Sequence, residues 1–178
     1  MANTFTLIAS STVGAGGAAS IDFTSIPSTY TDLVLKMCAR SSNASANTSL
    51  GYNFNGSTSG YSGVNALNYQ GTVYGGTFTT LSIGGVTYGR LDDSGLDAAN
   101  ATSSTFSNGE LYIPNYAGNT NKSWSWDCVA ENNSTAAVGI LVAGLWSNTA
   151  AITSIKLIPY QGSFVQYSTA YLYGVKNS

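Results

Sequence analysis

The acidic segment Asp92-Asp93-Ser94-Gly95-Leu96-Asp97 comes closer to a chemical site than any other part of the sequence. Its three carboxylates and the carbonyl groups around them are the oxygen ligands that Ca²⁺ takes in proteins. The segment lacks the spacing of a calcium-binding EF-hand loop and the bidentate Glu that closes such a loop. We therefore interpret it as a solvated loop, and a cation site at Asp92, Asp93 and Asp97 stays open as an alternative.

Catalytic constellations are otherwise missing from the sequence. The chain has no histidine, which removes Ser-His and Cys-His activation of a nucleophile and the commonest metal ligand. Glycoside hydrolysis needs two carboxylates that face each other across a site. The closest pair, Asp92 and Asp93, is adjacent in sequence, and adjacent strand residues point to opposite faces. The sequence predicts a protein that is not an enzyme and binds no cofactor.

Tyrosine is the residue type with the most capacity for recognition, since the chain has 12 of them. Tyr, Trp and Asn are common on surfaces that bind sugars or proteins. Most of the tyrosines are ordinary strand formers with the ring on the core. Those in the glycine-rich stretch between residues 60 and 90 are expected on loops, and they form our candidate interaction surface: Tyr61, Tyr69, Tyr74 and Tyr88.

Composition narrows the class of protein. Charged residues make up 8% of the 178-residue chain, against about 25% in an ordinary soluble domain. With a net charge of −2 and no run of cations, nucleic acid is not an expected partner. The longest apolar run, residues 136–146, is about half of a membrane-spanning helix, so no membrane segment is predicted. The start of the chain lacks the pattern of a secretory signal, which indicates synthesis in a cytoplasm. Cys38 and Cys128 are expected to be buried and reduced.

The elements that must position these residues read as strands. Residues 138–146 and 152–160 are two apolar runs that predict core strands joined by a tight connection. Residues 32–40 alternate with period two, and residues 122–130 place Trp124, Trp126 and Cys128 on one face. Further strand candidates are residues 5–8, 21–23, 50–55, 77–83, 110–113 and 170–175. About eight to ten strands without helical periodicity predict an all-β domain, an antiparallel two-sheet β-sandwich of jelly-roll type, with a closed barrel as the alternative.

One domain is expected, preceded by a flexible arm. Residues 10–19 are a flexible stretch of Ser, Gly and Ala with no packing group except Val13, so residues 1–19 are interpreted as an arm that could gain order on a neighbour. Residues 20–178 would form the sandwich. Its predicted core is Leu33, Leu35, Met37, Leu50, Phe54, Ile113, Trp126, Ile140, Val142, Trp146, Ile155, Leu157 and Leu172.

Several segments, in order along the chain, resemble small structural proteins of tailed bacteriophages. They are residues 21–33 leading to Arg40-Ser41, Gly144-Leu145-Trp146, residues 151–155, Gly162-Ser163-Phe164 and residues 171–175. The resemblance covers both ends of the domain, and residues 61–107 depart from it most. It implies single β-sandwich modules of the virion that have no catalytic residues, found as capsid decoration (cement) proteins or as parts of tails and fibres.

The resemblance sets the functional expectation. It implies a capsid decoration protein, a homotrimer that sits on the outside of a phage head and clamps neighbouring subunits of the major capsid protein. Closed cyclic symmetry would suit positions where three shell subunits meet. The arm at residues 1–19 would reach a neighbouring subunit. The alternative is a tail or tail-fibre module that binds a host surface glycan through loop tyrosines and Asn-rich turns.

Overall fold

The protein is built from β-strands alone in the part that the structure describes. The computed structural model describes residues 4–78, 80–91, 94–133 and 137–176. Within these residues no helix is long and apolar enough to span a membrane. The strands are β1 (Phe5–Thr12), β2 (Ile21–Phe23), β3 (Asp32–Ala39), β4 (Asn47–Thr48), β5 (Leu50–Phe54), β6 (Tyr61–Tyr69), β7 (Thr72–Phe78), β8 (Thr80–Ile83), β9 (Val86–Arg90), β10 (Leu96–Asp97), β11 (Ser107–Ile113), β12 (Lys122–Ala130), β13 (Val138–Trp146), β14 (Ile155–Pro159) and β15 (Thr169–Val175).

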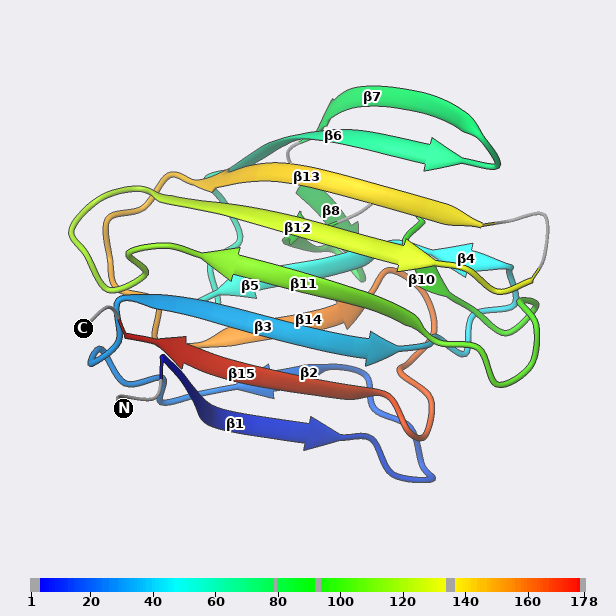
Figure 1. Ribbon diagram of the computed structural model, residues 1–178, viewed down its shortest axis with the longest axis horizontal. Coiled ribbons are helices and arrows are strands. Elements are labelled where there is room, and N and C mark those ends of the chain that lie inside the picture. Colours follow the sequence, from blue (N-terminus) through cyan, green and yellow to red (C-terminus); the bar gives the residue numbers. More distant parts are fainter. Residues whose placement is uncertain (1–3, 79, 92–93, 134–136, 177–178) are drawn as a thin grey trace.

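Two antiparallel sheets pack face to face (Figure 1). The larger sheet has eight strands in the order β1-β15-β3-β11-β12-β13-β6-β7, and the smaller sheet has five in the order β2-β14-β5-β9-β8. The short strands β4 and β10 form a separate pair. This arrangement confirms the predicted antiparallel two-sheet sandwich.

The chain crosses repeatedly between the two sheets of the sandwich. It passes from β3 in the larger sheet to β5 in the smaller one, then to β6 and β7, to β8 and β9, and back to β11. The two most apolar strands are also separated. β13 belongs to the larger sheet and β14 to the smaller sheet, so residues 147–154 carry the chain across the sandwich.

The core lies between the sheets, and every residue of the predicted core list is buried. Along β12 the burial alternates strictly, which puts Trp124, Trp126 and Cys128 inside as expected. Five buried rings form one aromatic cluster: Tyr52, Phe54, Tyr61, Trp124 and Trp146. The ring centroid of Tyr52 lies 5.1 Å from those of Tyr61 and Trp124. Edge-to-face contacts at such separations add to the stabilisation that burial itself gives.

One lysine is part of the core region. Lys122 is 1% exposed, and its ammonium donates hydrogen bonds to the carbonyl oxygens of Gly118, Thr120 and Thr149. Burial lowers the pKa of this ammonium group. The three bonds fasten the β11–β12 loop to the segment that follows β13, where the chain crosses to the smaller sheet.

The segment expected to be a flexible arm lies against the domain over much of its length. β1 forms seven residue pairs with β15, and Val13 is buried at 5% exposure. Ala18 forms a further bridge with Phe164. For the described residues, 4–19, these contacts correct the expectation of a flexible arm, because β1 forms one edge strand of the larger sheet.

Candidate interaction surface

The four tyrosines proposed for recognition lie on strands rather than on loops. Tyr61 and Tyr69 are the two ends of β6, Tyr74 is in β7 and Tyr88 is in β9. Tyr61 and Tyr88 are buried, and Tyr69 packs partly against the core. The Tyr61 hydroxyl accepts a bond from the Phe54 amide at 3.0 Å, and burial raises the pKa of this phenol to about 12. Tyr74, at 53% exposure, is the member of the set that has an exposed ring.

Asp97, the last residue of the acidic segment, is buried inside the domain. Asp97 is fully buried, and its Oδ1 accepts a hydrogen bond from the Asn132 amide at 2.7 Å. Its backbone N–H donates to the Ser107 hydroxyl at 2.6 Å. Asp92 and Asp93 lie outside the described residues. Among the described residues no group of three potential His, Cys, Asp or Glu ligands comes together, and Asp97 is a structural residue rather than part of a solvated loop.

Arg40, at the end of β3, anchors the loop of residues 98–105 that follows β10. Its guanidinium is buried and donates to the carbonyl oxygens of Ala101, Thr102 and Thr105 at 3.0, 2.8 and 2.8 Å. A planar guanidinium has five N–H donors in a fixed fork, so it can hold several carbonyl groups at once. The loop 98–105 is therefore fixed against the end of β3.

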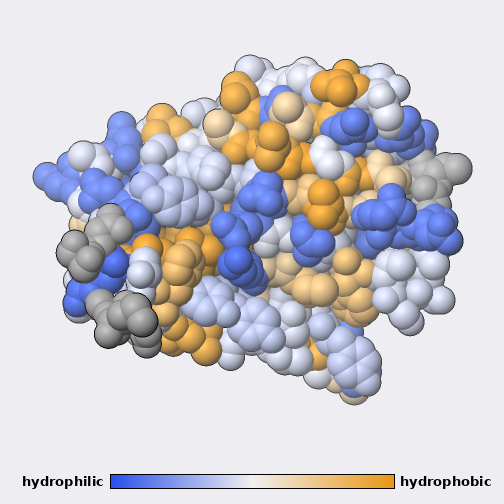
Figure 2. All heavy atoms as spheres, in the orientation of Figure 1, coloured by the Kyte–Doolittle hydropathy of each residue, from blue (hydrophilic) through white to orange (hydrophobic). Residues whose placement is uncertain are grey.

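The outer face of the larger sheet is apolar over β6, β7, β12 and β13. Strand pairing places Val129, Gly139, Asn68 and Val73 in one row, and Asp127, Leu141, Ala66 and Gly75 in the next. We call the following residues the apolar outer face: Val64, Ala66, Val73, Val129, Leu141 and Ala143. Leu141 is 64% exposed and Val73 72%. Figure 2 shows hydrophobic residues gathered over these strands. Shallow depressions lie between the side chains of this face.

A short row of charges borders this apolar area. Lys36 of β3 and Glu110 of β11 form an ion pair at 2.8 Å, and Asp127 of β12 lies next in the same row. The hydrogen bond and the attraction of Glu110 raise the pKa of Lys36. Burial, together with the charge of Glu110, raises the pKa of Asp127. Because Lys36 is engaged by Glu110, the carboxylate of Asp127 is the charge that faces the apolar side.

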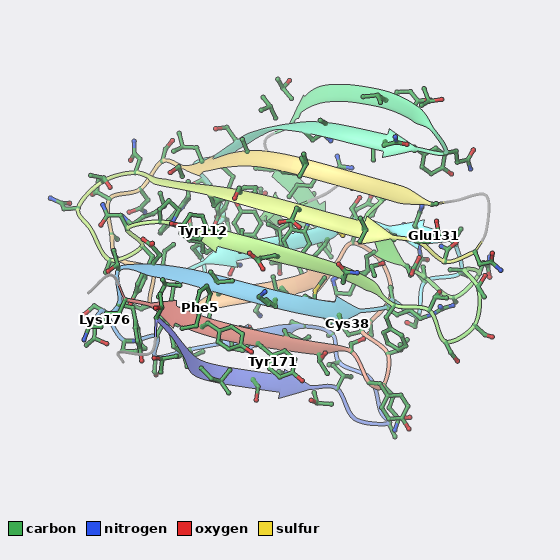
Figure 3. All side chains as sticks on the ribbon, in the orientation of Figure 1. Phe5, Cys38, Tyr112, Glu131, Tyr171 and Lys176 are labelled. Carbon is green, nitrogen blue, oxygen red and sulfur yellow. The ribbon has the colours of Figure 1, made fainter. Side chains whose placement is uncertain are left out.

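Beyond the charges, the same face carries aromatic rings. Phe5 of β1 packs edge-on against Tyr173 of β15, with ring centroids 6.4 Å apart. Tyr171 lies further along β15, and Tyr112 lies on β11, on the other side of β3 (Figure 3). The Tyr112 hydroxyl donates to Asp32 Oδ2 at 2.9 Å, which fixes that ring at the end of β11.

Both cysteines are free thiols, and they differ in burial. Cys38 lies on the outer face of β3 and is exposed, whereas Cys128 is buried. This corrects the expectation that both would be inside. Partial burial still raises the pKa of the Cys38 thiol.

Sequence reasoning missed the apolar outer face, although one signal for it was present. β13 is apolar on both of its faces, since Leu141 and Ala143 alternate with Ile140 and Val142. Strands that are apolar on both faces are typical of sheets covered on both sides. In this domain the second face of β13 is open, and Leu141 is exposed on it.

Comparison with protein-family models and with curated proteins found no match to this chain.

Proposed function

We propose that this protein is a structural component of a tailed-phage virion, a decoration protein that attaches to the outside of the capsid. The observation that carries the proposal is the apolar outer face, which is open in the single chain. Soluble monomers rarely expose large contiguous apolar patches, and such patches mark interaction sites. The resemblance of residues 21–33 and 171–175 to phage structural proteins supplies the setting, and the partner proposed is the major capsid protein.

The energetics suit a repeating lattice. Burying the half-exposed aliphatic side chains of Val64, Val73, Val129 and Leu141 would stabilise a contact by about 1 kcal/mol each, half of a full burial. Association itself costs about 4 kcal/mol or more, so a single face gives a weak contact. A decoration protein works by many copies, because each bound copy favours the intact shell over its dissociated state.

Asp127 adds a condition on the partner surface. Its carboxylate borders the apolar outer face and would be covered with it. A covered carboxylate needs a cationic or hydrogen-bonding partner, since an unpaired buried charge is strongly unfavourable. The proposed capsid surface is therefore apolar and carries a lysine or arginine opposite Asp127.

The alternative, glycan binding on a tail fibre, rests on loop tyrosines and Asn-rich turns. Two of the four, Tyr61 and Tyr88, are buried in the domain, so they are not free to stack on a sugar ring. We therefore place the decoration role first. The resemblance-based expectation of a homotrimer stays a prediction.

The test is copy number and location in virions of the phage that encodes the chain. Quantitative mass spectrometry should find hundreds of copies, and cryo-electron microscopy should find them over the head. A few copies confined to the tail would refute the proposal.

A variant pair then tests the surface. Leu141→Asp should abolish attachment to heads while the domain stays folded, because Leu141 is exposed on the apolar outer face. Val86→Asp is the matched control, since Val86 is exposed on β9 of the smaller sheet. Attachment of Leu141→Asp with unchanged affinity would show that another surface meets the capsid.

A further inference from the structure

Strand β7 is a long, open sheet edge. It ends the larger sheet beyond β6 (Figure 1), and residues 72–77 are all exposed. Its pairing with β6 runs without a break over seven residues, whereas β1 at the opposite edge has a register shift between Leu7 and Ala9. The edge strands of the smaller sheet, β2 and β8, have three and four residues.

The usual protections of an open edge are missing from β7. Natural proteins block long edges with charged side chains, proline, bulges or covering segments, because an unpaired row of N–H and C=O groups can pair with another chain. The sequence from Ser41 to Gly89 contains no Asp, Glu, Lys or Arg, and β7 contains no proline. The edge is therefore competent to pair with a further strand.

The turn between β6 and β7 determines which backbone groups are free. Gln70 and Gly71 form its two-residue loop with φ of 53° and 82°, values typical of a type I′ turn. In such a hairpin the flanking residues Tyr69 and Thr72 exchange backbone hydrogen bonds, and every second pair does the same. The residues of the intervening pairs in β7, Val73, Gly75 and Thr77, direct their backbone N–H and C=O groups away from β6.

Two glycines in the centre of this edge have no explanation within the single chain. Gly75 and Gly76 do not have positive φ, and a Cβ atom at either would meet Asn65 at 3.6 or 3.5 Å, an ordinary contact. Some strand glycines elsewhere are required by packing, for example Gly109, where a Cβ would lie 2.4 Å from the Trp126 ring. Glycine weakens a strand interior and often marks the close approach of another backbone.

We propose that β7 pairs with β7 of a second copy of this chain, antiparallel about a twofold axis at Gly75. Gly75 then faces Gly75 of the second copy, and Val73 faces Thr77. All backbone groups that point away from β6 at these three residues meet partners, which gives six hydrogen bonds across the axis. Without charges on either strand, no like-charge repulsion opposes the pairing.

The register is complementary at the side chains as well. Tyr74 faces Gly76 of the second copy in the intervening pair, so its exposed ring can cover the glycine across the strands. An aromatic ring opposite a strand glycine is a recognised way of stabilising such a pair. The same register thus accounts for both glycines and for the exposure of Tyr74.

The proposed pair would also shape the binding surface. A twofold axis perpendicular to the sheet joins two larger sheets edge to edge, with both apolar outer faces on the same side. Two linked faces bind a repeating surface more tightly than one, provided both can reach it together. The pairing itself does not depend on the capsid role, and it favours a dimer over the trimer expected from the resemblance.

Sedimentation velocity over a concentration series tests the proposal. The wild-type chain should sediment as a dimer of twice its 18.4 kDa mass. Gly75→Lys would place two ammonium groups opposite each other at the axis and should raise the dissociation constant about tenfold or more. The control, Thr6→Lys on the opposite edge strand β1, should remain dimeric. Circular dichroism and tryptophan fluorescence check that each variant is folded.

Cross-linking tests the register independently of stability. Gly75→Cys in a Cys38→Ser background should form a disulfide-linked dimer on mild oxidation, because paired residues of this kind have Cα atoms about 5.5 Å apart. Thr6→Cys in the same background should not. A wild-type monomer or trimer would overturn the proposal, and so would a dimer that Gly75→Lys leaves intact and Gly75→Cys does not link. None of these results bears on where the protein sits in the virion, so the two proposals fail separately.

Discussion

Adding one methyl group at Gly144 should damage the core, because this glycine makes room for a tryptophan ring. A Cβ atom at Gly144 of β13 would lie 1.9 Å from Cζ2 and 2.1 Å from Cε2 of Trp124. Trp124 is 4% exposed and packs edge-on against Tyr52, with ring centroids 5.1 Å apart. Because the ring is buried and packed against Tyr52, the sheet or the aromatic cluster must shift to make room for the methyl group.

The magnitude follows from this overlap. Overpacking a well-filled core typically costs about 1 to 3 kcal/mol, and we expect Gly144→Ala to lie near the upper end, at about 3 kcal/mol. Gly139 in the same strand is the matched control, because no atom lies within 4 Å of a Cβ placed there. Gly139→Ala should leave the stability unchanged or raise it by about 0.5 kcal/mol, since alanine suits a strand better than glycine.

Urea denaturation followed by tryptophan fluorescence measures both variants. Gly144→Ala should lower the denaturation midpoint with little change in slope, and the melting temperature should fall by roughly 6 to 12 °C. Equal stability losses in the two variants, within about 0.5 kcal/mol, would refute the reasoning, because the packing of Trp124 would then not distinguish the two positions.

Three further predictions concern buried polar groups. Tyr61→Phe should lower the free energy of unfolding by about 1 to 2 kcal/mol in urea, because the Phe54 amide loses its acceptor; an unchanged midpoint would show that water replaces the hydroxyl. Lys122→Met should lower the free energy of unfolding by roughly 3 kcal/mol, because three carbonyl groups lose their donor. The surface control Lys156→Met should lower it by less than about 1 kcal/mol. Similar losses in the two variants would argue against a stabilising role for the three hydrogen bonds of Lys122. Burial raises the pKa of Tyr61 from 10.0 to about 12 and also raises the pKa of Tyr52. The folded state therefore favours the neutral phenols, so the stability that these two residues contribute is complete below pH 10 and is lost as the pH rises toward 12. Absorbance titration at 295 nm should show these phenols ionising together with unfolding, and ionisation of Tyr61 near pH 10 in the folded protein would contradict this.

Period-two patterning was sufficient to predict the strands and their inward residues. In a strand, successive side chains point to opposite faces of the sheet, so every second residue faces the core. The alternation of residues 122–130 therefore placed Trp124 and Trp126 inside without any knowledge of their neighbours. All thirteen predicted core residues are buried for the same reason, and the near absence of charge indicated a surface of hydroxyls and amides.

The glycine-rich stretch could not be resolved from the sequence, because its strands depend on long-range partners. Glycines interrupt the pattern between residues 60 and 90, so the sequence predicted only short strands there, such as residues 77–83, and placed the tyrosines of β6, β7 and β9 on loops. β6 is held by nine residue pairs with β13, which lies about 75 positions further along the chain. That pairing, rather than local preference, carries Tyr61 into the aromatic cluster and leaves Tyr74 at the open edge.

The sequence by itself determined the fold class, the strands of regular alternation and the faces that they bury, since these follow from local geometry. The tertiary structure decided which sheet each strand joins, which glycines are required and which apolar residues stay exposed. Gly139 and Gly144 are the same residue type in the same strand, yet only Gly144 lies beneath a ring. Likewise, Leu141 and Ile140 are adjacent aliphatic residues of β13. The smaller sheet covers only the inner face of the larger sheet, so Ile140 is buried and Leu141 is exposed. Packing is a property of pairs that are distant in sequence, so no local pattern specifies it.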